Sequence, residues 1–455
     1  MENQNLLEIE YLSKKYDETN IPLYLSYPTT SWWKSEADEA SFIQSYHQET
    51  NPYLYFHFPY CKEACYYCCC YKEVTKEESK KELYLQYLKK EFQQKLSKLQ
   101  LDRYPKIRRI HWGGGTPTYL SCNQIESFFK AIAPKIELID SADSNISIEA
   151  YPDDEVLTEE KLRLLRSLGF NEISFGIQDF DDRIQQTIHR DCKPETARKI
   201  VSQAKSLGFR VHIDLCYGLP FQGLHELETT IRQIAVMAPD RVALFPYVHY
   251  PVIFPLQKRI PTASLPNSFI KILLLMRAEE LFTAYGYHKI GIDHFVKAHD
   301  PLYPAAGSQK IIKDFMGYSV DQRSCFIGFG NSAISFLGNH YYHNTILLKD
   351  YYEQLDQGNL PLEKAMAHGL SPDDQIRSQM IQKSILSDFM IDKKAINHEY
   401  GIDFDQYFQA ELALLQDYEK DGLIDSATGD RISLTPTGKA LARQIAYVFD
   451  SYYVK

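Results

Sequence analysis

The sequence predicts an α/β protein built on six consecutive βα units, with additions at both ends. The chain has 455 residues, which is enough for two or more hydrophobic cores or for one large α/β barrel with additions. Between residues 52 and 247, short β-rich runs alternate with amphipathic stretches that end near a glycine. Ligand-binding residue types follow several of these runs. The alternation favours a parallel sheet, either open or closed as a barrel.

The predicted elements follow one another in a regular order. The first strand is "PYLYFHF" (52–58). The helix after it carries an apolar stripe made of Leu85, Leu88, Phe92, Leu96 and Leu99. The later strands are "IRRIHW" (107–112), "NISIEA" (145–150), "EISFGIQDF" (172–180), "RVHIDLCYGLP" (210–220) and "DRVALFPY" (240–247). Two of the intervening helices end at glycines, in "EKLRLLRSLG" (160–169) and "AKSLGF" (204–209).

Five of the nine cysteines lie within "CKEACYYCCC" (61–70). Cys61, Cys65 and Cys68 have the spacing Cys-x3-Cys-x2-Cys. A structural zinc site needs four ligands, usually in two pairs, and no second pair follows. Buried thiols explain single cysteines better than five in ten residues, and a redox disulfide needs only two. An odd number of cysteines in a long chain does not indicate a secreted disulfide framework.

An iron–sulfur cluster explains this spacing best. Four thiolates normally complete a 4Fe-4S cube, so three leave one iron open to a substrate or cofactor with N and O ligands. Tyr66 and Tyr67 lie between the ligands, where they could shield the cluster from water. Cys69 and Cys70 are left without a role in holding the metal.

Other candidate residues also follow predicted strands, where parallel barrels place their catalytic groups. These are the cysteines, "GGGTPT" (113–118), Glu149, Gln178 and Asp214. One polar residue after a strand is often only a loop residue, but the whole set indicates a site. The glycine run allows close approach of backbone to a ligand, and it matches neither the Rossmann fingerprint nor the P-loop.

Composition narrows the class of protein. The net charge of −10 argues against a nucleic-acid binder that works by bulk charge. The sequence has no apolar run long enough to span a bilayer and no signal peptide at its start. We therefore expect a cytoplasmic protein with no membrane or nucleic-acid partner.

The cysteine spacing resembles that of the radical S-adenosylmethionine (SAM) enzymes, and the full set of motifs resembles the oxygen-independent coproporphyrinogen III oxidases. The resemblance covers nearly the whole chain. It rests on "YFHFPYCKEACYYCCCYKEVTK" (55–76), "HWGGGTPTYL" (111–120), "SIEAYP" (147–152), "GFNEISFGIQDF" (169–180), "IDLCYGLP" (213–220), "FPYVHYP" (245–251), "IDHF" (292–295), "GNSAIS" (330–335) and a segment ending at "KDGLIDSATGDRISLTPTG" (420–438).

The resemblance implies a partial (β/α)6 radical SAM barrel with one 4Fe-4S cluster on Cys61, Cys65 and Cys68 and two molecules of SAM. Electron transfer from the cluster would cleave SAM to a 5′-deoxyadenosyl radical. That radical would take hydrogen from propionate side chains of coproporphyrinogen III, which lose carbon dioxide and become the vinyl groups of protoporphyrinogen IX, in heme biosynthesis. An electron donor and an electron acceptor are implied but not identified.

The resemblance also implies which residues form the site, by their positions in the matching motifs. The expected contacts to the first SAM are Tyr55, Gly114, Glu149, Val248 and Ile334. The expected contacts to the second SAM are Tyr67, Gly115, Thr116, Gln178, Arg190 and Asp214. Arg190 can pair with the methionine carboxylate. Cys70 matches the family's extra cysteine, near the substrate, and is expected to act after radical formation.

We expect a monomer. We also expect the chain to divide into four parts, with a separate C-terminal domain of a common size. They are an N-terminal covering segment (1–45), the radical SAM barrel (46–280), a barrel extension (281–360) and a mainly helical, winged-helix-like C-terminal domain (361–455). "GLIDSATGDRISLTPTG" (422–438) reads as the wing. Because the domain has no strong basic run, a substrate cover is preferred to nucleic-acid binding.

Four positions depart from the usual family pattern. Leu23 stands where Arg is usual, Cys69 replaces Gly, and Pro246 and Val248 stand where Asn and Ala are common. The Leu23 position bears on anchoring of the substrate or of the second SAM.

Two alternatives remain open. One is a radical SAM enzyme with another substrate, of the methyltransferase or cyclopropanase type. The other is a heme-binding chaperone, whose relatives lack the cysteine found here at position 70. Four histidines could ligate heme, although each fits better as a packed or substrate-facing residue: His57, His111, His249 and His294.

Overall fold

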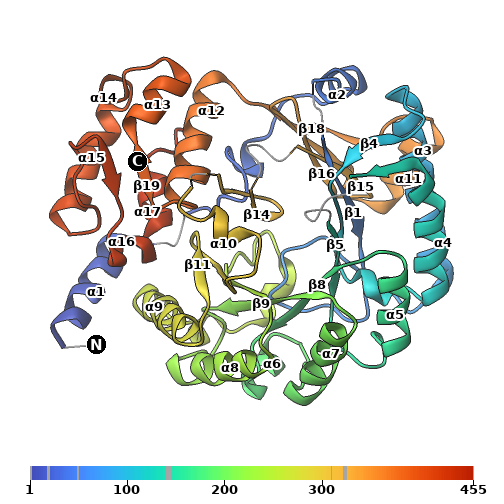
Figure 1. Ribbon diagram of the computed structural model, residues 1–455, viewed down its shortest axis with the longest axis horizontal. Coiled ribbons are helices and arrows are strands. Elements are labelled where there is room, and N and C mark those ends of the chain that lie inside the picture. The colour runs from blue at the N-terminus through green and yellow to red at the C-terminus, as the bar shows by residue number, and fades with distance from the viewer. Residues whose placement is uncertain are drawn as a thin grey trace.

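The computed structural model describes residues 3–17, 21–48, 51–139, 145–308, 310–320 and 325–453. A twelve-stranded sheet forms its centre (Figure 1). In spatial order the strands are β11 (His288–Ile290), β12 (His294–Val296), β10 (Arg241–Pro246), β9 (Arg210–Tyr217), β8 (Glu172–Gln178), β7 (Asn145–Ala150), β5 (Arg109–Gly114), β1 (Tyr53–Phe58), β15 (Phe326–Phe329), β16 (Ile334–Leu337), β17 (His340–Asn344) and β18 (Leu362–Gly369). No ladder joins the end strands β11 and β18 within the described residues, so the curved sheet is an open barrel.

The six strands from β10 to β1 are parallel to their neighbours and correspond to the six predicted strands. Their carboxyl ends therefore meet along one edge of the sheet. The predicted α/β class with a partial parallel barrel is confirmed. A register shift between Gly176 and Gln178 interrupts the ladder of β8 and β9 at this edge, and such bulges re-aim side chains.

Further strands extend the sheet on both sides. β15 is a seventh parallel strand, beside β1, with Tyr55 opposite Gly328. β16, β17 and β18 continue from it as an antiparallel meander. On the other side, β12 pairs antiparallel with β10, and β11 pairs with β12. These additions widen the wall around the carboxyl edge of the parallel strands.

Helices cover the outer side of the sheet (Figure 1). They are α3 (Glu78–Lys98), α4 (Cys122–Ile132), α5 (Glu159–Ser167), α6 (Asp182–Thr187), α7 (Pro194–Ser206), α8 (Leu224–Met237), α9 (Ser268–Ala284) and α11 (Leu348–Asp356). The predicted apolar stripe of α3 is buried. α4 begins with a capping box in which Ser121 and Gln124 exchange side-chain and backbone hydrogen bonds, which satisfies two of the free N–H groups at a helix start.

An ion pair is buried on the inner face of α3. Glu91 and Lys95 are both fully buried, with 2.7 Å between the Lys95 Nζ and the Glu91 Oε1. Lys95 also donates to the Gly328 carbonyl at 2.6 Å. The Gly330 N–H donates to Glu91 Oε2 at 2.6 Å. The pair thus holds the segment that leaves β15 toward β16.

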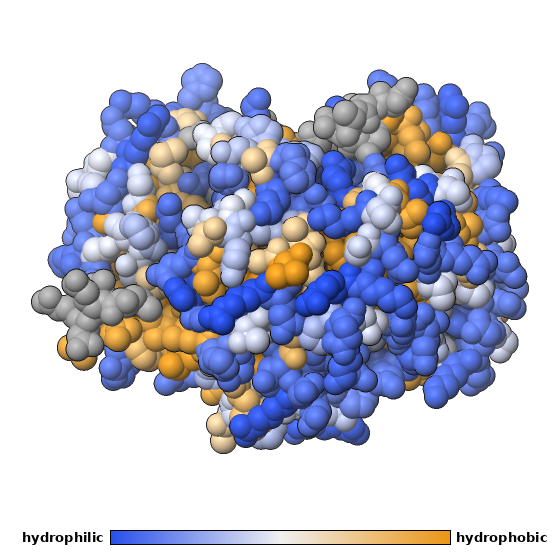
Figure 2. All heavy atoms as spheres, turned by 60° about the horizontal axis from the view of Figure 1, so that its bottom comes forward, coloured by the Kyte–Doolittle hydropathy of each residue, from blue (hydrophilic) through white to orange (hydrophobic). Residues whose placement is uncertain are grey.

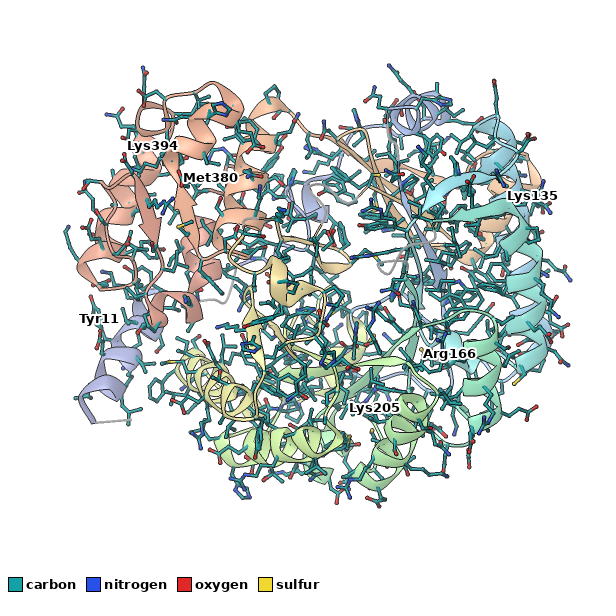
Figure 3. All side chains as sticks on the ribbon, in the orientation of Figure 1. Tyr11, Lys135, Arg166, Lys205, Met380 and Lys394 are labelled. Carbon is teal, nitrogen blue, oxygen red and sulfur yellow. The ribbon has the colours of Figure 1, made fainter. Side chains whose placement is uncertain are left out.

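A smaller helical domain follows β18. Its elements are α12 (Pro372–Ser378), the π-helix η6 (Gln379–Ile385), β19 (Met390–Asp392), α13 (Lys393–Tyr400), α14 (Phe404–Tyr407), α15 (Gln409–Lys420), β20 (Arg431–Ser433), α16 (Pro436–Ala440) and α17 (Ala442–Tyr447). Met380, labelled in Figure 3, is fully buried in its core. The predicted wing folds back through one antiparallel bridge, between Ile424 and Leu434, and β20 pairs with β19.

The N-terminal segment packs on this C-terminal domain. Ile9 and Leu12 of α1 (Asn3–Lys15) belong to its hydrophobic cluster. Farther along, the buried Tyr24 hydroxyl donates to Asp450 Oδ2 at 3.0 Å. The Tyr27 hydroxyl lies 3.0 Å from Ser451 Oγ. We call Tyr24, Tyr27, Asp450 and Ser451 the terminal clasp.

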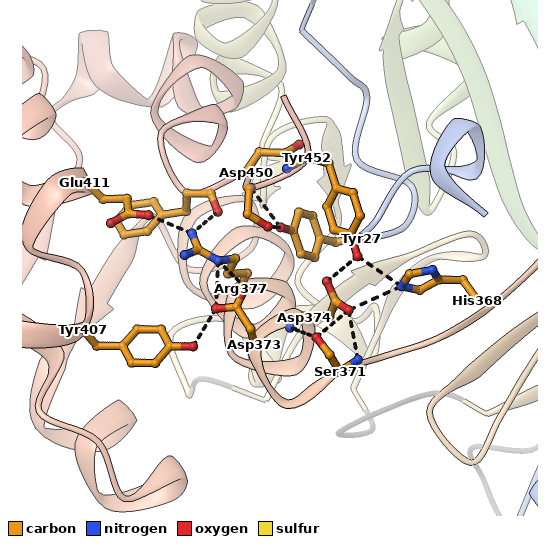
Figure 4. Close-up of polar contacts among 12 residues, drawn as sticks. Tyr27, His368, Ser371, Asp373, Asp374, Arg377, Tyr407, Glu411, Asp450 and Tyr452 are labelled. Carbon is orange, nitrogen blue, oxygen red and sulfur yellow. Dashed lines mark hydrogen bonds and ion pairs between the residues drawn. The ribbon is translucent and has the colours of Figure 1, made fainter. Parts of the chain in front are cut away.

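Polar contacts order the neighbourhood of the clasp (Figure 4). Arg377 donates to Asp373 and to Glu411, at 2.9 and 2.8 Å. The Tyr452 hydroxyl donates to Asp374 Oδ1 at 2.9 Å. The predicted boundaries of the four parts, 1–45, 46–280, 281–360 and 361–455, remain predictions.

The remaining elements are short. They are α2 (Glu39–Tyr46), α10 (Leu302–Ala305), the pairs β2 (Tyr60–Cys61) with β3 (Glu73–Val74), β4 (Tyr104–Ile107) with β6 (Ile136–Leu138) and β13 (Ile312–Asp314) with β14 (Gly317–Ser319), and the 3-10 turns η1 (Thr30–Trp32), η2 (Pro117–Tyr119), η3 (Ala133–Lys135), η4 (Pro255–Arg259) and η5 (Thr262–Ser264). Hydrophilic side chains dominate the face in Figure 2, with hydrophobic ones in small patches. Within the described ranges, no helix has the length and hydrophobicity needed to cross a bilayer.

Candidate active site

The three spaced cysteines lie in a loop that leaves the carboxyl end of β1. Cys61 is buried at the end of β2, and its sulfur accepts a hydrogen bond from Thr116 Oγ1 at 3.5 Å. Cys65 Sγ accepts one from Arg190 Nη1 at 3.3 Å. Lys72 Nζ donates to the Cys68 carbonyl at 3.2 Å. The loop therefore places hydrogen-bond donors beside two of the thiols and a lysine beside the backbone of the third.

The thiols of this loop differ in acidity. Burial raises the pKa of Cys61 to about 11. A hydrogen bond from Cys70, aided by the nearby Lys72 ammonium, lowers the pKa of Cys68 to about 6. The same contact raises the pKa of Cys70 well above its usual value. Cys68 is thus the thiolate of the pair and Cys70 the protonated partner.

The arrangement bears on the alternatives for the cysteines. All nine cysteines are free thiols, so no disulfide joins the cysteines of this loop. Among the described residues, no three His, Cys, Asp or Glu side chains converge closely enough to hold a single metal ion. The thiolates of an iron–sulfur cluster bind different irons.

The glycine run lies alongside the cysteine loop. The Gly115 N–H donates to the Phe58 carbonyl at 2.8 Å, and the Thr116 N–H to the Tyr60 carbonyl at 3.0 Å. Gly114 has φ +112°, and a Cβ there would lie 2.5 Å from the His57 ring. A Cβ on Gly113 would lie 2.6 Å from Glu149 Oε1. Larger residues would therefore push His57 and Glu149 out of place.

Glu149 is held at the carboxyl end of β7 by two donors. The Gly114 N–H donates to its Oε2 at 3.1 Å, and His111 Nε2 lies 3.1 Å from its Oε1. His111 is itself fixed by Ser147 Oγ, 2.7 Å from Nδ1, and its ring stacks on Tyr55 with 5.9 Å between centroids. The carboxylate stays 40% exposed, so it can still accept bonds from a ligand.

Asp214 lies on β9, which β8 separates from β7. Ser174 Oγ donates to its Oδ2 at 2.6 Å. Burial, with the nearby Glu149 charge adding to it, raises the pKa of Asp214 to about 6. Gln178 ends β8 with φ +75°, next to the register shift. A positive φ outside glycine stores strain, which is typical of functional positions.

Arg190 joins the cysteine loop to β8. Its Nη1 donates to Cys65 Sγ and, at 3.2 Å, to the Tyr67 hydroxyl, and its Nη2 donates to the Gly176 carbonyl. The guanidinium also lies over the Tyr151 ring, 4.5 Å from the centroid. Its Nε is buried and has no hydrogen-bond partner. The guanidinium is therefore fixed in place with one donor left over.

Two predicted apolar contacts lie at opposite sides of the sheet. Val248 follows β10, and its carbonyl accepts from Gln257 Nε2, which also donates to the Tyr67 carbonyl. Ile334 begins β16, where Ser335 Oγ accepts from the Gly328 N–H opposite Tyr55. Hydrogen bonds thus link Cys61 to Thr116, Arg190 to both Cys65 and Tyr67, and Glu149 to Gly114. All the predicted roles remain predictions.

Several residues of the site were not predicted from the sequence. Ser147, Ser174 and Gln257 hold the predicted residues, and Lys72 flanks Cys68. Ser147 precedes Glu149 by two residues on β7, so the period of two along a strand could have identified it. Gln257 had no such signal, because it reaches the loop from a distant turn.

The four histidines considered as heme ligands have other partners. His111 bonds to Ser147 and Glu149, His249 to Tyr247, and His294 to Asp293. His57 Nδ1 lies 3.0 Å from the Tyr55 hydroxyl, and burial lowers its pKa to about 4. Its buried Nε2 has no hydrogen-bond partner among the described residues.

The residues present fit a 4Fe-4S cluster and SAM. The donor set includes three free thiols in one loop, and two buried nitrogens, His57 Nε2 and Arg190 Nε, have no hydrogen-bond partner among the described residues. Cys61, Cys65 and Cys68 would hold the metal. Glu149, Arg190 and Asp214 offer complementary charges for the amino, carboxylate and hydroxyl groups of SAM.

Comparisons with known proteins agree with this geometry. Residues 55–234 match the family described as the Radical SAM superfamily, and residues 370–441 match the HemN C-terminal domain. The oxygen-independent coproporphyrinogen III oxidase of Salmonella typhimurium is 35% identical over 444 residues, covering 97% of this chain and 94% of the relative. The Escherichia coli protein of the same name is 36% identical with the same coverage.

A solved structure is also similar over its whole length. It is described as coproporphyrinogen III oxidase (HemN) from Escherichia coli, a radical SAM enzyme. The TM-score is 0.87 at 35% identity, with 95% of this chain and 98% of that chain covered. Membership of the radical SAM superfamily implies a 4Fe-4S cluster and SAM. The fold, the cysteine loop and these similarities together show that the chain belongs to the family of oxygen-independent coproporphyrinogen III oxidases.

Proposed function

We propose that this protein decarboxylates two propionate side chains of coproporphyrinogen III to vinyl groups without oxygen, giving protoporphyrinogen IX in heme biosynthesis. The observation that carries the proposal is the edge of the sheet where the cysteine loop, the glycine run, Glu149 and Arg190 meet. Relatives named oxygen-independent coproporphyrinogen III oxidase match nearly the whole chain, including the C-terminal domain.

Cys61, Cys65 and Cys68 hold the cluster in this proposal. Cluster and SAM supply, when bound, the one-electron chemistry that removes a hydrogen atom from a propionate side chain. Glu149 binds a SAM amino or hydroxyl group, together with Tyr55, Gly114, Val248 and Ile334. A second SAM contacts Tyr67, Gly115, Thr116, Gln178, Arg190 and Asp214. Two sites are supported by the two separate carboxylates, Glu149 on β7 and Asp214 on β9.

The protein groups act mainly by orientation. Gly114 and His111 fix one carboxylate, and Ser174 fixes the other, so neither must reorganise when a ligand arrives. Cys70 contacts Cys68 but lies outside the ligand set; we propose that it acts on the substrate side after hydrogen removal. The C-terminal domain and the N-terminal segment cover the substrate rather than bind nucleic acid.

The proposal also covers the location of the protein, its oligomeric state and its electron-transfer partners. The protein works as a cytoplasmic monomer, takes electrons from a separate donor and passes the substrate's electrons to an acceptor. Leu23 lies next to Tyr24 of the clasp, where its side chain cannot form the charged contact that Arg would provide.

The test is anaerobic incubation of the reconstituted protein with coproporphyrinogen III, SAM and dithionite. Protoporphyrinogen IX and 5′-deoxyadenosine should form together. Formation of 5′-deoxyadenosine with another substrate, but never with this one, would support the methyltransferase or cyclopropanase alternative. Tight heme binding without SAM cleavage would support the chaperone alternative.

A further inference from the structure

The outer side of the cysteine loop carries a continuous cationic and aromatic surface. Six residues form it, and we call them the cysteine-loop surface: Tyr66, Arg183, His189, Phe221, Lys258 and Arg259. They come from the loop itself, α6 and the turn after it, the turn after β9, and η4. None of them belongs to the proposed SAM or cluster contacts.

Contacts join most of these residues in two groups, one around Tyr66 and one made of Arg183 and Phe221. The Tyr66 ring stacks on His189 with 4.7 Å between centroids and 7° between planes. Arg259 Nη1 donates to the Tyr66 hydroxyl at 2.8 Å. The Arg183 guanidinium lies 3.6 Å from the centroid of the Phe221 ring. Beneath them lies one apolar cluster: Ile184, Ile188, Cys216, Leu219, Tyr247 and Ile260, with Tyr66 packed against it.

The surface is tied directly to the proposed metal ligands. The Tyr66 N–H donates to the Ile188 carbonyl at 2.9 Å, so the loop is fixed to the end of α6. Tyr66 adjoins Cys65 in the chain, and Cys65 and Cys68 are only half-buried. Gln257, between the exposed Lys258 and the loop, donates to the Tyr67 carbonyl at 3.2 Å. A protein seated here would lie against the loop that holds the cluster.

Charge distinguishes this surface from its surroundings. Nearby cations are paired: Lys62 with Asp153 and Glu155, and Lys193 with Asp182 and Asp191. Arg183, Lys258 and Arg259 form no ion pair with any carboxylate in the described ranges. Glu63 in the same loop and Asp181, the N-cap of α6, form no ion pair among the described residues, so three unpaired cations face two unpaired anions. The chain as a whole has a net charge of −10.

The adjoining loop adds apolar contact area. Val252 is 90% exposed and Ile253 64% exposed. Exposed arginines, aromatic rings and aliphatic side chains around a well-packed base are typical of protein–protein interfaces.

We propose that the cysteine-loop surface docks an acidic, one-electron carrier protein that reduces the cluster. The proposal rests on the proposed function, which consumes one electron for each SAM cleaved. In the docked complex one electron passes from the reduced carrier to the cluster, and the carrier leaves oxidised by one electron. An acidic carrier is repelled by most of this acidic protein and attracted here, so the local field selects both partner and orientation.

The test compares charge-reversed variants with two reductants. Arg183→Glu, Lys258→Glu and the double variant remove or reverse cations that do not touch the cysteine loop through their side chains. The matched control is Lys135→Glu, an exposed and unpaired lysine beside α4, at the edge of the molecule in Figure 3. The probes are a plant-type [2Fe–2S] ferredoxin, with a potential of about −400 mV, and dithionite.

Two quantities are measured anaerobically: the Kd of oxidised ferredoxin by thermophoresis, and the rate of cluster bleaching after mixing with reduced ferredoxin or dithionite. The double variant should weaken binding and slow ferredoxin-driven bleaching roughly tenfold at low ionic strength. The difference should shrink as salt rises. Dithionite-driven bleaching and the Lys135→Glu variant should behave as wild type.

Several outcomes would overturn the docking proposal. The first is that wild-type protein binds no ferredoxin at low ionic strength. The second is that the double variant binds ferredoxin as tightly as wild type does. The third is that Lys135→Glu weakens ferredoxin binding as much as the double variant does. Slow bleaching of the double variant with dithionite as well as with ferredoxin would also contradict the proposal, because the substitutions would then have damaged the cysteine loop itself. Failure of wild type to cleave SAM even with dithionite would instead contradict the proposed function.

Discussion

The guanidinium of Arg190 lies between Cys65 and Tyr67 and donates to both from Nη1, at 3.3 Å to the sulfur and 3.2 Å to the hydroxyl. One side chain thus connects a proposed metal ligand with the proposed site of the second SAM. Its planar fork also reaches the Gly176 carbonyl through Nη2, a geometry that an ammonium group cannot reproduce.

Arg190→Lys should keep the cluster but weaken SAM binding. Lysine retains the charge and loses the bidentate fork, so we expect about tenfold to a hundredfold lower SAM affinity, which corresponds to a charge-assisted bond of about 1.5–3 kcal/mol. Equilibrium dialysis with labelled SAM measures the affinity, and iron analysis checks the cluster. Arg198→Lys, on the exposed face of α7, is the control. Unchanged SAM affinity would exclude this role for Arg190.

The cysteines should separate into two groups. Cys61→Ala, Cys65→Ala and Cys68→Ala should each lose the 4Fe-4S absorbance and SAM cleavage, because each removes a proposed ligand. Cys70→Ala should keep iron and SAM cleavage but decarboxylate poorly, and Cys69→Gly should change little. Iron content, absorbance and 5′-deoxyadenosine yield distinguish them. If Cys70→Ala lost its iron, the ligand set would have to be reassigned.

Glu149→Gln should lose affinity for SAM without losing stability. The carboxylate accepts from Gly114 and His111, and the amide can keep one of these bonds while losing its charge. We expect a decrease of about tenfold to a hundredfold in SAM affinity. Glu160→Gln, on the exposed side of α5, is the matched control. Normal affinity together with normal turnover would rule out a ligand contact.

Asp214→Asn should stabilise the protein without ligands above pH 6. Burial raises the folded-state pKa of Asp214 to about 6 from 3.8, so the unfolded chain ionises first as pH rises. Stability is therefore lost between about pH 4 and pH 6, and the penalty is constant above that. Because the amide carries no charge, it removes this penalty. Asp214→Asn should therefore raise the free energy of unfolding by about 1–3 kcal/mol at pH 7.5 and change it little at pH 4. Urea unfolding at both pH values provides the measurement; equal effects at both would contradict the assigned pKa.

Removing one partner of the buried ion pair of α3 should reduce the stability of the protein far more than removing one partner of an exposed pair with the same spacing. Glu91→Gln leaves the Lys95 charge buried without its partner and should cost about 3–5 kcal/mol. Glu126→Gln breaks the exposed pair with Lys130 on α4 and should cost at most about 0.5 kcal/mol. Urea denaturation compares the two. Similar losses would mean that the buried pair is not ionised as described.

The six parallel strands could be predicted because each is an apolar run followed by a turn and by a chemically distinctive residue. β15 was not predicted as a parallel strand, since "FIGF" is short and its pairing with β1 joins segments more than 270 residues apart. Ser174 is not predicted, because a serine within a strand is unremarkable until the fold brings Asp214 of β9 within hydrogen-bond distance of it. Motif spacing located the proposed thiol ligands, whereas the residues that orient the site come from tertiary packing.

The C-terminal wing shows a similar limit. The sequence predicts a hairpin within residues 422–438, but only Ile424 and Leu434 bridge directly. The rest of β20 pairs with β19, whose short sequence "MID" gives no strand signal of its own.

The terminal clasp has a consequence for the order of events during synthesis. Tyr24 and Asp450 are 426 positions apart, so at about 5–20 residues per second the ribosome needs roughly 20–85 s between them. The barrel strands and the cysteine loop emerge well before Asp450 does. Throughout that interval Tyr24 lacks the Asp450 carboxylate as a partner. Synthesis order therefore makes the clasp one of the last tertiary contacts that the chain can form.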